Sequence, residues 1–131
     1  MKYIVAAIFL AFAATAHAQD AEIRGVIDQQ FEAFKADDVD EAFSFASPNI
    51  QRIFRTPEMF GMMVQQGYPM VWRPGDVRYL PLEDRDGQLV QRVLITDAQG
   101  AVHALEYHMI EGAEGWLIDG VFLLPAPDVA A

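Results

Sequence analysis

Cysteine is absent from this 131-residue chain. The absence excludes disulfide bonds, cysteine nucleophiles and iron–sulfur clusters. The fold must therefore be stabilised by the packing of an apolar core. Histidine is scarce as well, with 3 residues in the whole chain, which leaves few ligands for a transition-metal site.

Basic residues are few, with 9 lysines and arginines against 19 aspartates and glutamates, giving a net charge of −10 at pH 7. Such a surface repels phosphate backbones and anionic membranes, so we expect no nucleic-acid partner. The acidic excess is typical of a solubility feature, and recruitment of a cationic partner is the alternative. The sequence also has no nucleotide-binding motif, and we expect no cofactor.

Long apolar runs are missing except at the N-terminus, where residues 4–14 are apolar. This run is shorter than the roughly 20 residues that span a bilayer. Lys2 precedes it, and the small residues Ala16 and Ala18 follow it, which is the pattern of a secretory signal. We predict a signal peptide over residues 1–18, cleaved after Ala18. The protein would then be periplasmic or secreted, with no membrane anchor after processing.

Residues 19–124 are predicted to form one domain, followed by a loose tail over residues 125–131. The domain begins with helical periodicity, since apolar residues recur at helical spacing from Ile23 to Phe34. Asp20 is a favoured capping residue just before this stripe, so we expect the first helix to begin there.

Two further helices are indicated by their capping residues. Asp38 and Glu41 have the spacing of a capping box, which predicts a short second helix that ends before Pro48. The sequence Thr56-Pro57-Glu58 predicts the start of a third helix, which Gly67 would end.

The second half of the chain has the pattern of strands separated by short turns. Because short connections force successive strands to be antiparallel, we expect a four-stranded meander. With the three N-terminal helices packed on one face of this curved antiparallel sheet, the fold class is α+β. The predicted strands are Val77–Glu83, Leu89–Thr96, Ala101–Ile110 and Trp116–Leu124.

Alternation along the last two strands predicts which side chains face the core. On the third strand the apolar set faces inward, and Glu106 and His108 face away. The last strand is apolar on both faces, which predicts that a second copy of the chain covers its outer side. The inward set of the third strand is Leu105, Tyr107 and Met109; the two sets of the last strand are Trp116, Ile118, Phe122 and Leu117, Val121, Leu123.

A family resemblance is carried by residues 33–38, 42–48, 56–60, 63–64, 68–69, 91–93 and 116–120. These stretches resemble an uncharacterised bacterial group, the domain-of-unknown-function family 4864. The order of helices and strands, and the closing Gly115-Trp116-Leu117-Ile118, are similar to the NTF2-like (cystatin-like) α+β cone. The resemblance implies a cone-shaped domain with a pocket, and it implies no particular activity.

The residues that could form a site fall into two groups, and each has a structural alternative. A predicted pocket is lined by aromatic side chains and a methionine, which could instead be core residues. An acid–base set lies on the last two strands, where solvated cross-strand neighbours are the alternative. The pocket residues are Tyr68, Trp72, Tyr107, Trp116 and Met63, and the acid–base residues are Glu106, His108 and Asp119.

No metal site is predicted, because His103 and His108 lie five residues apart on one strand and point to opposite faces. We favour a non-enzymatic exported domain that binds a small apolar ligand or dimerises through its sheet face. One alternative is an acid–base enzyme, an isomerase or dehydratase acting on a small apolar substrate. The other is a protein-interaction module that uses the exposed sheet face.

Overall fold

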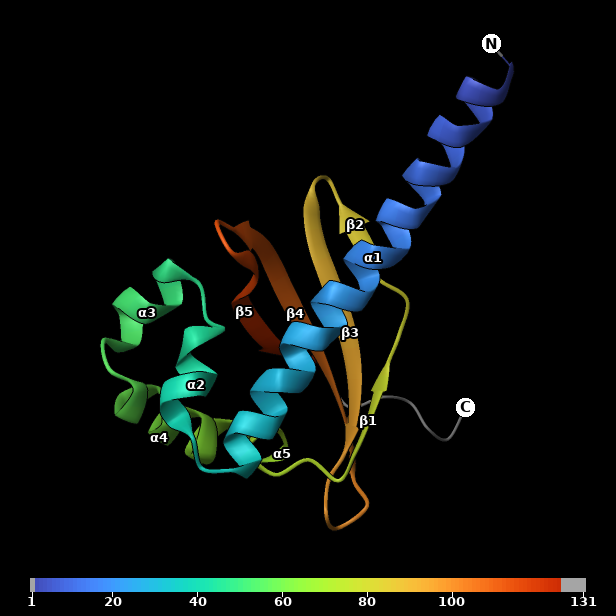
Figure 1. Cartoon of the computed structure of the whole chain (residues 1–131). Coiled ribbons are helices and arrows are strands. Elements are labelled where there is room, and N and C mark those ends of the chain that lie inside the picture. The colour runs from blue at the N-terminus through green and yellow to red at the C-terminus, as the bar shows by residue number, and fades with distance from the viewer. Residues whose placement is uncertain (1, 126–131) are drawn as a thin grey trace.

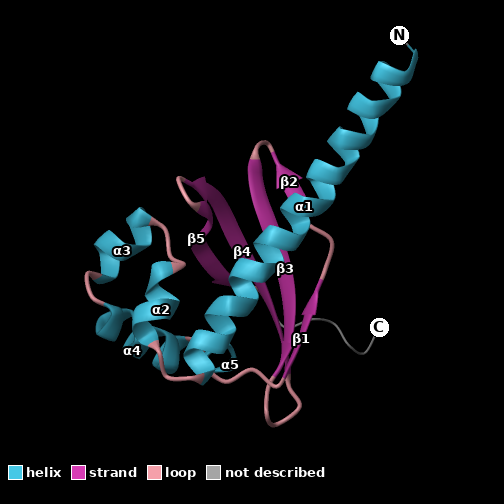
Figure 2. Cartoon of the chain, viewed as in Figure 1, coloured by secondary structure: helices cyan, strands magenta, loops and turns pink. Residues whose placement is uncertain are grey.

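The computed structural model describes residues 2–125, with side chains from Ala18 onward, as a group of helices on one face of an antiparallel sheet (Figures 1 and 2). The helices are α1 (Lys2–Lys35), α2 (Val39–Ser44), α3 (Pro48–Phe54), α4 (Pro57–Gly67) and α5 (Pro69–Trp72). The strands are β1 (Asp76–Tyr79), β2 (Glu83–Arg85), β3 (Gln88–Thr96), β4 (Val102–Gly112) and β5 (Gly115–Leu123).

The N-terminal helix differs from its predicted start, because α1 passes through Asp20 instead of beginning there. The predicted signal peptide covers residues 1–18, and all but the last of its side chains lie outside the described residues, as does most of the predicted tail. Both therefore stay predictions. Among residues 18–125, whose side chains the structure describes, no helix has both the length and the apolar character needed to cross a membrane.

The sheet confirms the α+β class and the antiparallel meander. Its strand order is β1-β3-β4-β5, and β2 pairs with the other end of β3. The prediction of four strands is wrong, because the segment expected to be one strand, 77–83, is divided into β1 and β2. Pro81 lies in the gap, where its missing N–H cannot donate to the sheet.

The helical half contains the three predicted helices and two more. The Asp38 carboxylate accepts from Glu41 N at 3.1 Å, and Thr56 Oγ1 accepts from Met59 N at 3.1 Å, so both predicted caps are confirmed. The count of three helices is wrong, because α3 and α5 also form. Each begins with a proline at its first position, where a helix tolerates the missing N–H.

The core lies between α1 and the inner face of the sheet, with α1 crossing that face (Figure 1). The apolar stripe predicted for α1 is confirmed, since Ile23, Ile27 and Phe34 are fully buried. The inward set of β4 is confirmed as well, and Tyr107 is among the largest fully buried side chains of the described residues.

A β-bulge interrupts the last strand. Ile118 pairs with Met109 and Gly120 pairs with His108, so the residue between them, Asp119, has no partner in β4. An extra residue of this kind bends a strand and changes which side its neighbours face.

The bulge overturns the predicted alternation of β5. Trp116 and Ile118 are buried in the core, and Val121 packs against the same core, although the pattern placed Val121 on the opposite face. Phe122, expected to share the face of Trp116, is instead 51 % exposed and pairs with Glu106 on the outer face. A period-two pattern assumes that every residue of the strand is paired, so it cannot predict the position of an unpaired residue.

Candidate functional site

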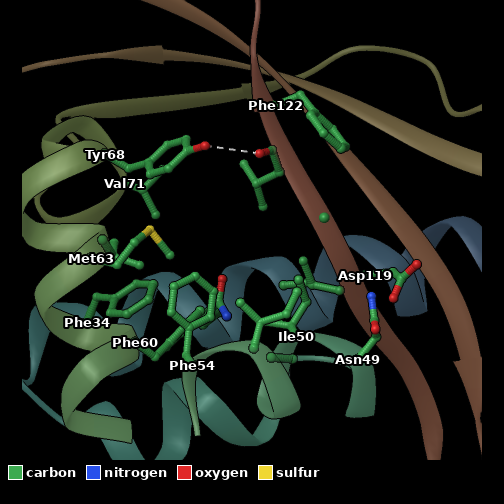
Figure 3. Close-up of a pocket in the computed structure, with 17 residues that line it drawn as sticks. Phe34, Asn49, Ile50, Phe54, Phe60, Met63, Tyr68, Val71, Asp119 and Phe122 are labelled. Carbon is green, nitrogen blue, oxygen red and sulfur yellow. Dashed lines mark hydrogen bonds between the residues drawn. The ribbon is translucent and has the colours of Figure 1, made fainter. Parts of the chain in front are cut away.

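An apolar cavity of about 340 Å³ lies between α3, α4 and the bulged part of β5 (Figure 3). Its volume is within the range of small-molecule sites. Most of the residues that line it are aliphatic or aromatic. They are Gln30, Phe34, Ala46, Asn49, Ile50, Ile53, Phe54, Phe60, Met63, Val64, Tyr68, Val71, Ile118, Asp119, Gly120, Val121 and Phe122.

A cluster of aromatic rings forms the base of this cavity. The ring centroid of Phe60 lies 6.0 Å from that of Phe34, 5.3 Å from that of Phe43 and 5.7 Å from that of Phe54. The Trp72 ring packs against Phe34, with ring centroids 5.5 Å apart. These ring contacts hold α1, α2, α3 and α4 together at the base of the cavity.

The connection between α2 and α3 fixes α3 against β5. Ser47 N donates to the carbonyl of Ile118 at 2.9 Å, and Ile118 N donates to the carbonyl of Phe45 at 2.8 Å. Only a single bridge forms here, between Ala46 and Ile118, and the chain then turns into α3. The side chain of Ser47 caps that helix by accepting from Ile50 N at 3.2 Å.

The polar end of the cavity is formed by the bulge and the start of α3. The Ser47 hydroxyl, which is fully buried, donates to Asp119 Oδ1 at 2.7 Å. Asn49 and Asp119 lie together at this end in Figure 3, and both line the cavity. Within the described chain, Asp119 Oδ2 has no hydrogen-bond partner and no basic side chain lies within 4.0 Å of the carboxylate.

Tyr68 stands at the other end of the cavity (Figure 3). It follows α4, and its hydroxyl donates to the carbonyl of Val121 at 3.2 Å. This hydrogen bond joins the end of α4 to β5 just beyond the bulge. The cavity is therefore closed at one end by an aromatic ring and is polar at the other.

Of the five predicted pocket residues, the structure brings Met63 and Tyr68 to this cavity. Trp72 packs beside Phe34, outside the lining. Tyr107 and Trp116 belong to the core, and burial raises the pKa of Tyr107. Tyr107 is therefore a core residue, and its hydroxyl has no hydrogen-bond partner among the described residues.

The predicted acid–base residues do not converge. Asp119 lies at the cavity, whereas Glu106 and His108 alternate along β4 with the buried Leu105, Tyr107 and Met109 and so face the other side of the sheet. His108 Nε2 lies 3.5 Å from Glu106 Oε1. Their separation from Asp119 follows from the strand alternation, which the bulge breaks only after Ile118.

Glu106 is the centre of an ion-pair cluster on the outer face. Arg85 holds its carboxylate with two hydrogen bonds, of 3.1 and 2.6 Å, and Arg92 Nε adds one of 3.0 Å. The Arg85 guanidinium is the main cause that lowers the pKa of Glu106 from 4.5 to about 2, against the effect of burial. A carboxylate so firmly charged is a poor proton donor or acceptor near neutral pH.

The two histidines with described side chains lie apart, as their spacing predicts. His103 Nε2 lies 2.8 Å from Asp97 Oδ2, and this contact lowers the pKa of Asp97. His108 packs edge-on against Phe122, with ring centroids 4.7 Å apart. Within residues 18–125, no three His, Asp or Glu side chains are grouped closely enough to hold a metal ion.

The cavity residues that sequence reasoning missed come from α3 and from the bulge. Ile50, Ile53 and Phe54 were not expected in a helix. Ser47 followed by a proline is a typical helix start, and this pair could have predicted α3.

A family model described as a domain of unknown function (DUF4864) matches residues 16–131. Comparison with curated proteins and with solved structures found no significant match. Because the family model covers nearly all of the sequence, the chain belongs to the DUF4864 family of domains of unknown function.

Proposed function

We propose that this protein binds a small, mainly apolar ligand in the cavity between α3, α4 and β5. The observation that carries the proposal is a concave, mainly apolar cavity of about 340 Å³ with a polar group at one end. Two other depressions, which include Trp116, are more open and more polar. Binding is preferred to acid–base catalysis because Glu106 and His108 lie across the sheet from Asp119.

The same proposal includes the fold type and the location. Helices that cover one face of an antiparallel sheet and enclose a pocket support an NTF2-like domain over residues 19–124. A basic residue, an apolar run and two small residues at the N-terminus support export of that domain to the periplasm or beyond.

Filling the cavity is expected to abolish binding. Met63 lines the cavity and is partly exposed, so tryptophan at this position can occupy the apolar space. We expect octanol, a neutral apolar probe, to shift amide NMR signals of cavity residues in a saturable way. In Met63→Trp these shifts should disappear.

The matched control for that variant is Met62→Trp. Met62 precedes Met63 on α4, is 52 % exposed and does not line the cavity. Met62→Trp should bind octanol as the unaltered protein does. Equal binding in both variants, or no saturable shift in the unaltered protein, would contradict the proposed cavity function.

We also propose that two copies associate through the outer side of β5. This strand is at an edge of the sheet, and near its end Phe122, which pairs with Glu106 on the outer face, is 51 % exposed. Light scattering of the purified protein should give the mass of a dimer, and Phe122→Lys should give that of a monomer. A monomer at high concentration before any substitution would rule the association out.

A further inference from the structure

We propose that the ligand of this cavity carries a cationic head group, an alkylammonium, which the Asp119 carboxylate binds while the apolar part fills the cavity. The inference rests on the proposed binding function and adds the chemical class of the ligand. It is carried by the juxtaposition of an unneutralised carboxylate with an otherwise uncharged, apolar lining.

The backbone places this carboxylate at the cavity. Asp119 is the bulged residue of β5 and has no partner in β4. Its side chain is therefore free of the strand alternation that places Glu106 and His108 on the outer face. The Ser47 hydroxyl, donating to Oδ1, then fixes its orientation. Bulges that direct a side chain toward a site are a recurrent device in proteins.

The electrostatics of the lining favour a cation over an anion. Among the described residues that line the cavity, Asp119 has the only formal charge. Glu106, the most deeply buried carboxylate elsewhere in the sheet, is neutralised by Arg85 and Arg92. By contrast, no described arginine or lysine lies within 4.0 Å of the Asp119 carboxylate. An anionic head group would meet this charge without a counterion, whereas an ammonium group would neutralise it.

The hydrogen-bonding capacity of the site agrees with the same class. Asp119 Oδ2 is a free acceptor within the described chain, and the Asn49 side chain, with one amide oxygen, lies at the same end of the cavity (Figure 3). An ammonium group is a donor with three N–H bonds and no acceptor, and it matches the free carboxylate oxygen. At the opposite end, the lining offers rings and methyl groups to a hydrocarbon chain.

The test compares three probes of equal chain length on the full-length protein: octylamine, octanol and octanoate. Titrations followed by amide NMR shifts give the affinity of each. We expect octylamine to bind about fivefold more tightly than octanol, as for a partly exposed ion pair, and octanoate to bind most weakly. Added salt should weaken the binding of octylamine but not that of octanol or octanoate.

Asp119→Asn removes the charge and keeps an oxygen that can accept from Ser47. In this variant the advantage of octylamine over octanol should disappear. Glu111→Gln, which changes an exposed carboxylate outside the cavity, should leave the preference for octylamine unchanged.

The outcomes separate this inference from the proposed function. If the three probes bind equally, or if octylamine keeps its advantage in Asp119→Asn, the cationic ligand class is wrong while the binding cavity stands. If octanoate binds most tightly, the inference is again wrong. If none of the probes binds, the proposed function itself fails.

Discussion

Phe34→Ala is expected to lower the free energy of unfolding by about 3–5 kcal/mol, because it removes a fully buried ring and leaves a cavity. Phe34 contacts the rings of Phe60 and Trp72, and so one substitution loosens the attachment of α4 and α5 to α1. A loss of this size is a large part of the roughly 5–15 kcal/mol that stabilises a typical domain. Chemical denaturation followed by circular dichroism measures it.

The control for Phe34→Ala is Phe122→Ala, which removes the same side chain from a half-exposed position. We expect a loss of less than about 1 kcal/mol there. Phe34 also lines the cavity, so the deleted ring should enlarge the binding space. Equal losses in the two variants would mean that Phe34 is not the buried centre of the aromatic cluster.

Glu106→Gln is expected to destabilise the protein by about 1–3 kcal/mol at neutral pH. Glutamine keeps the shape of the side chain but loses the charge that Arg85 and Arg92 face at 2.6 and 3.0 Å. The loss is less than for a fully buried ion pair, because both arginine side chains are about 40 % exposed and water can solvate them.

This destabilisation should depend on pH in a defined direction. The pKa of Glu106 is 4.5 when unperturbed and about 2 in the folded protein, chiefly because of the hydrogen bonds from Arg85. A lowered pKa stabilises the fold in full above the unfolded value, and this contribution is lost as the pH falls through the folded value. The difference between the parent protein and Glu106→Gln should therefore be constant above pH 4.5 and shrink toward pH 2.

Denaturation curves of both proteins at several pH values measure this difference. Glu83→Gln serves as the control, since Glu83 contacts the same two arginines with a side chain that is 38 % exposed. It should change the stability by less than about 1 kcal/mol at any pH. A difference for Glu106→Gln that grows as the pH falls would contradict the proposed ion-pair cluster.

Much of the local structure could be predicted because it depends on neighbours in the sequence. The caps at Asp38 and Thr56 bond to backbone groups three residues away, and the apolar spacing of α1 requires only the helical period. The inward face of β4, with Tyr107 at its centre, follows from alternation alone. Such features are short-range, so the residue types were enough to indicate them.

The candidate site was predicted only in part, for a physical reason. Met63 and Tyr68 were expected at a pocket because they lie on and just after an amphipathic helix. Asp119 was expected beside Glu106 and His108, because strict alternation aligns it with the outer face. Which residue of a strand is left unpaired depends on the register with its neighbour, and the register is a property of two strands together.

By itself, the sequence determined the fold class, the antiparallel meander, the helix caps and the acidic charge of this protein. The tertiary structure alone decided that Asp119 is the bulged residue, that Ser47 binds it from 72 positions away, and that α3 completes the cavity. The reason is that caps, turns and periodicities are contacts between near neighbours. The cavity is formed by segments that meet only when helices and sheet pack together.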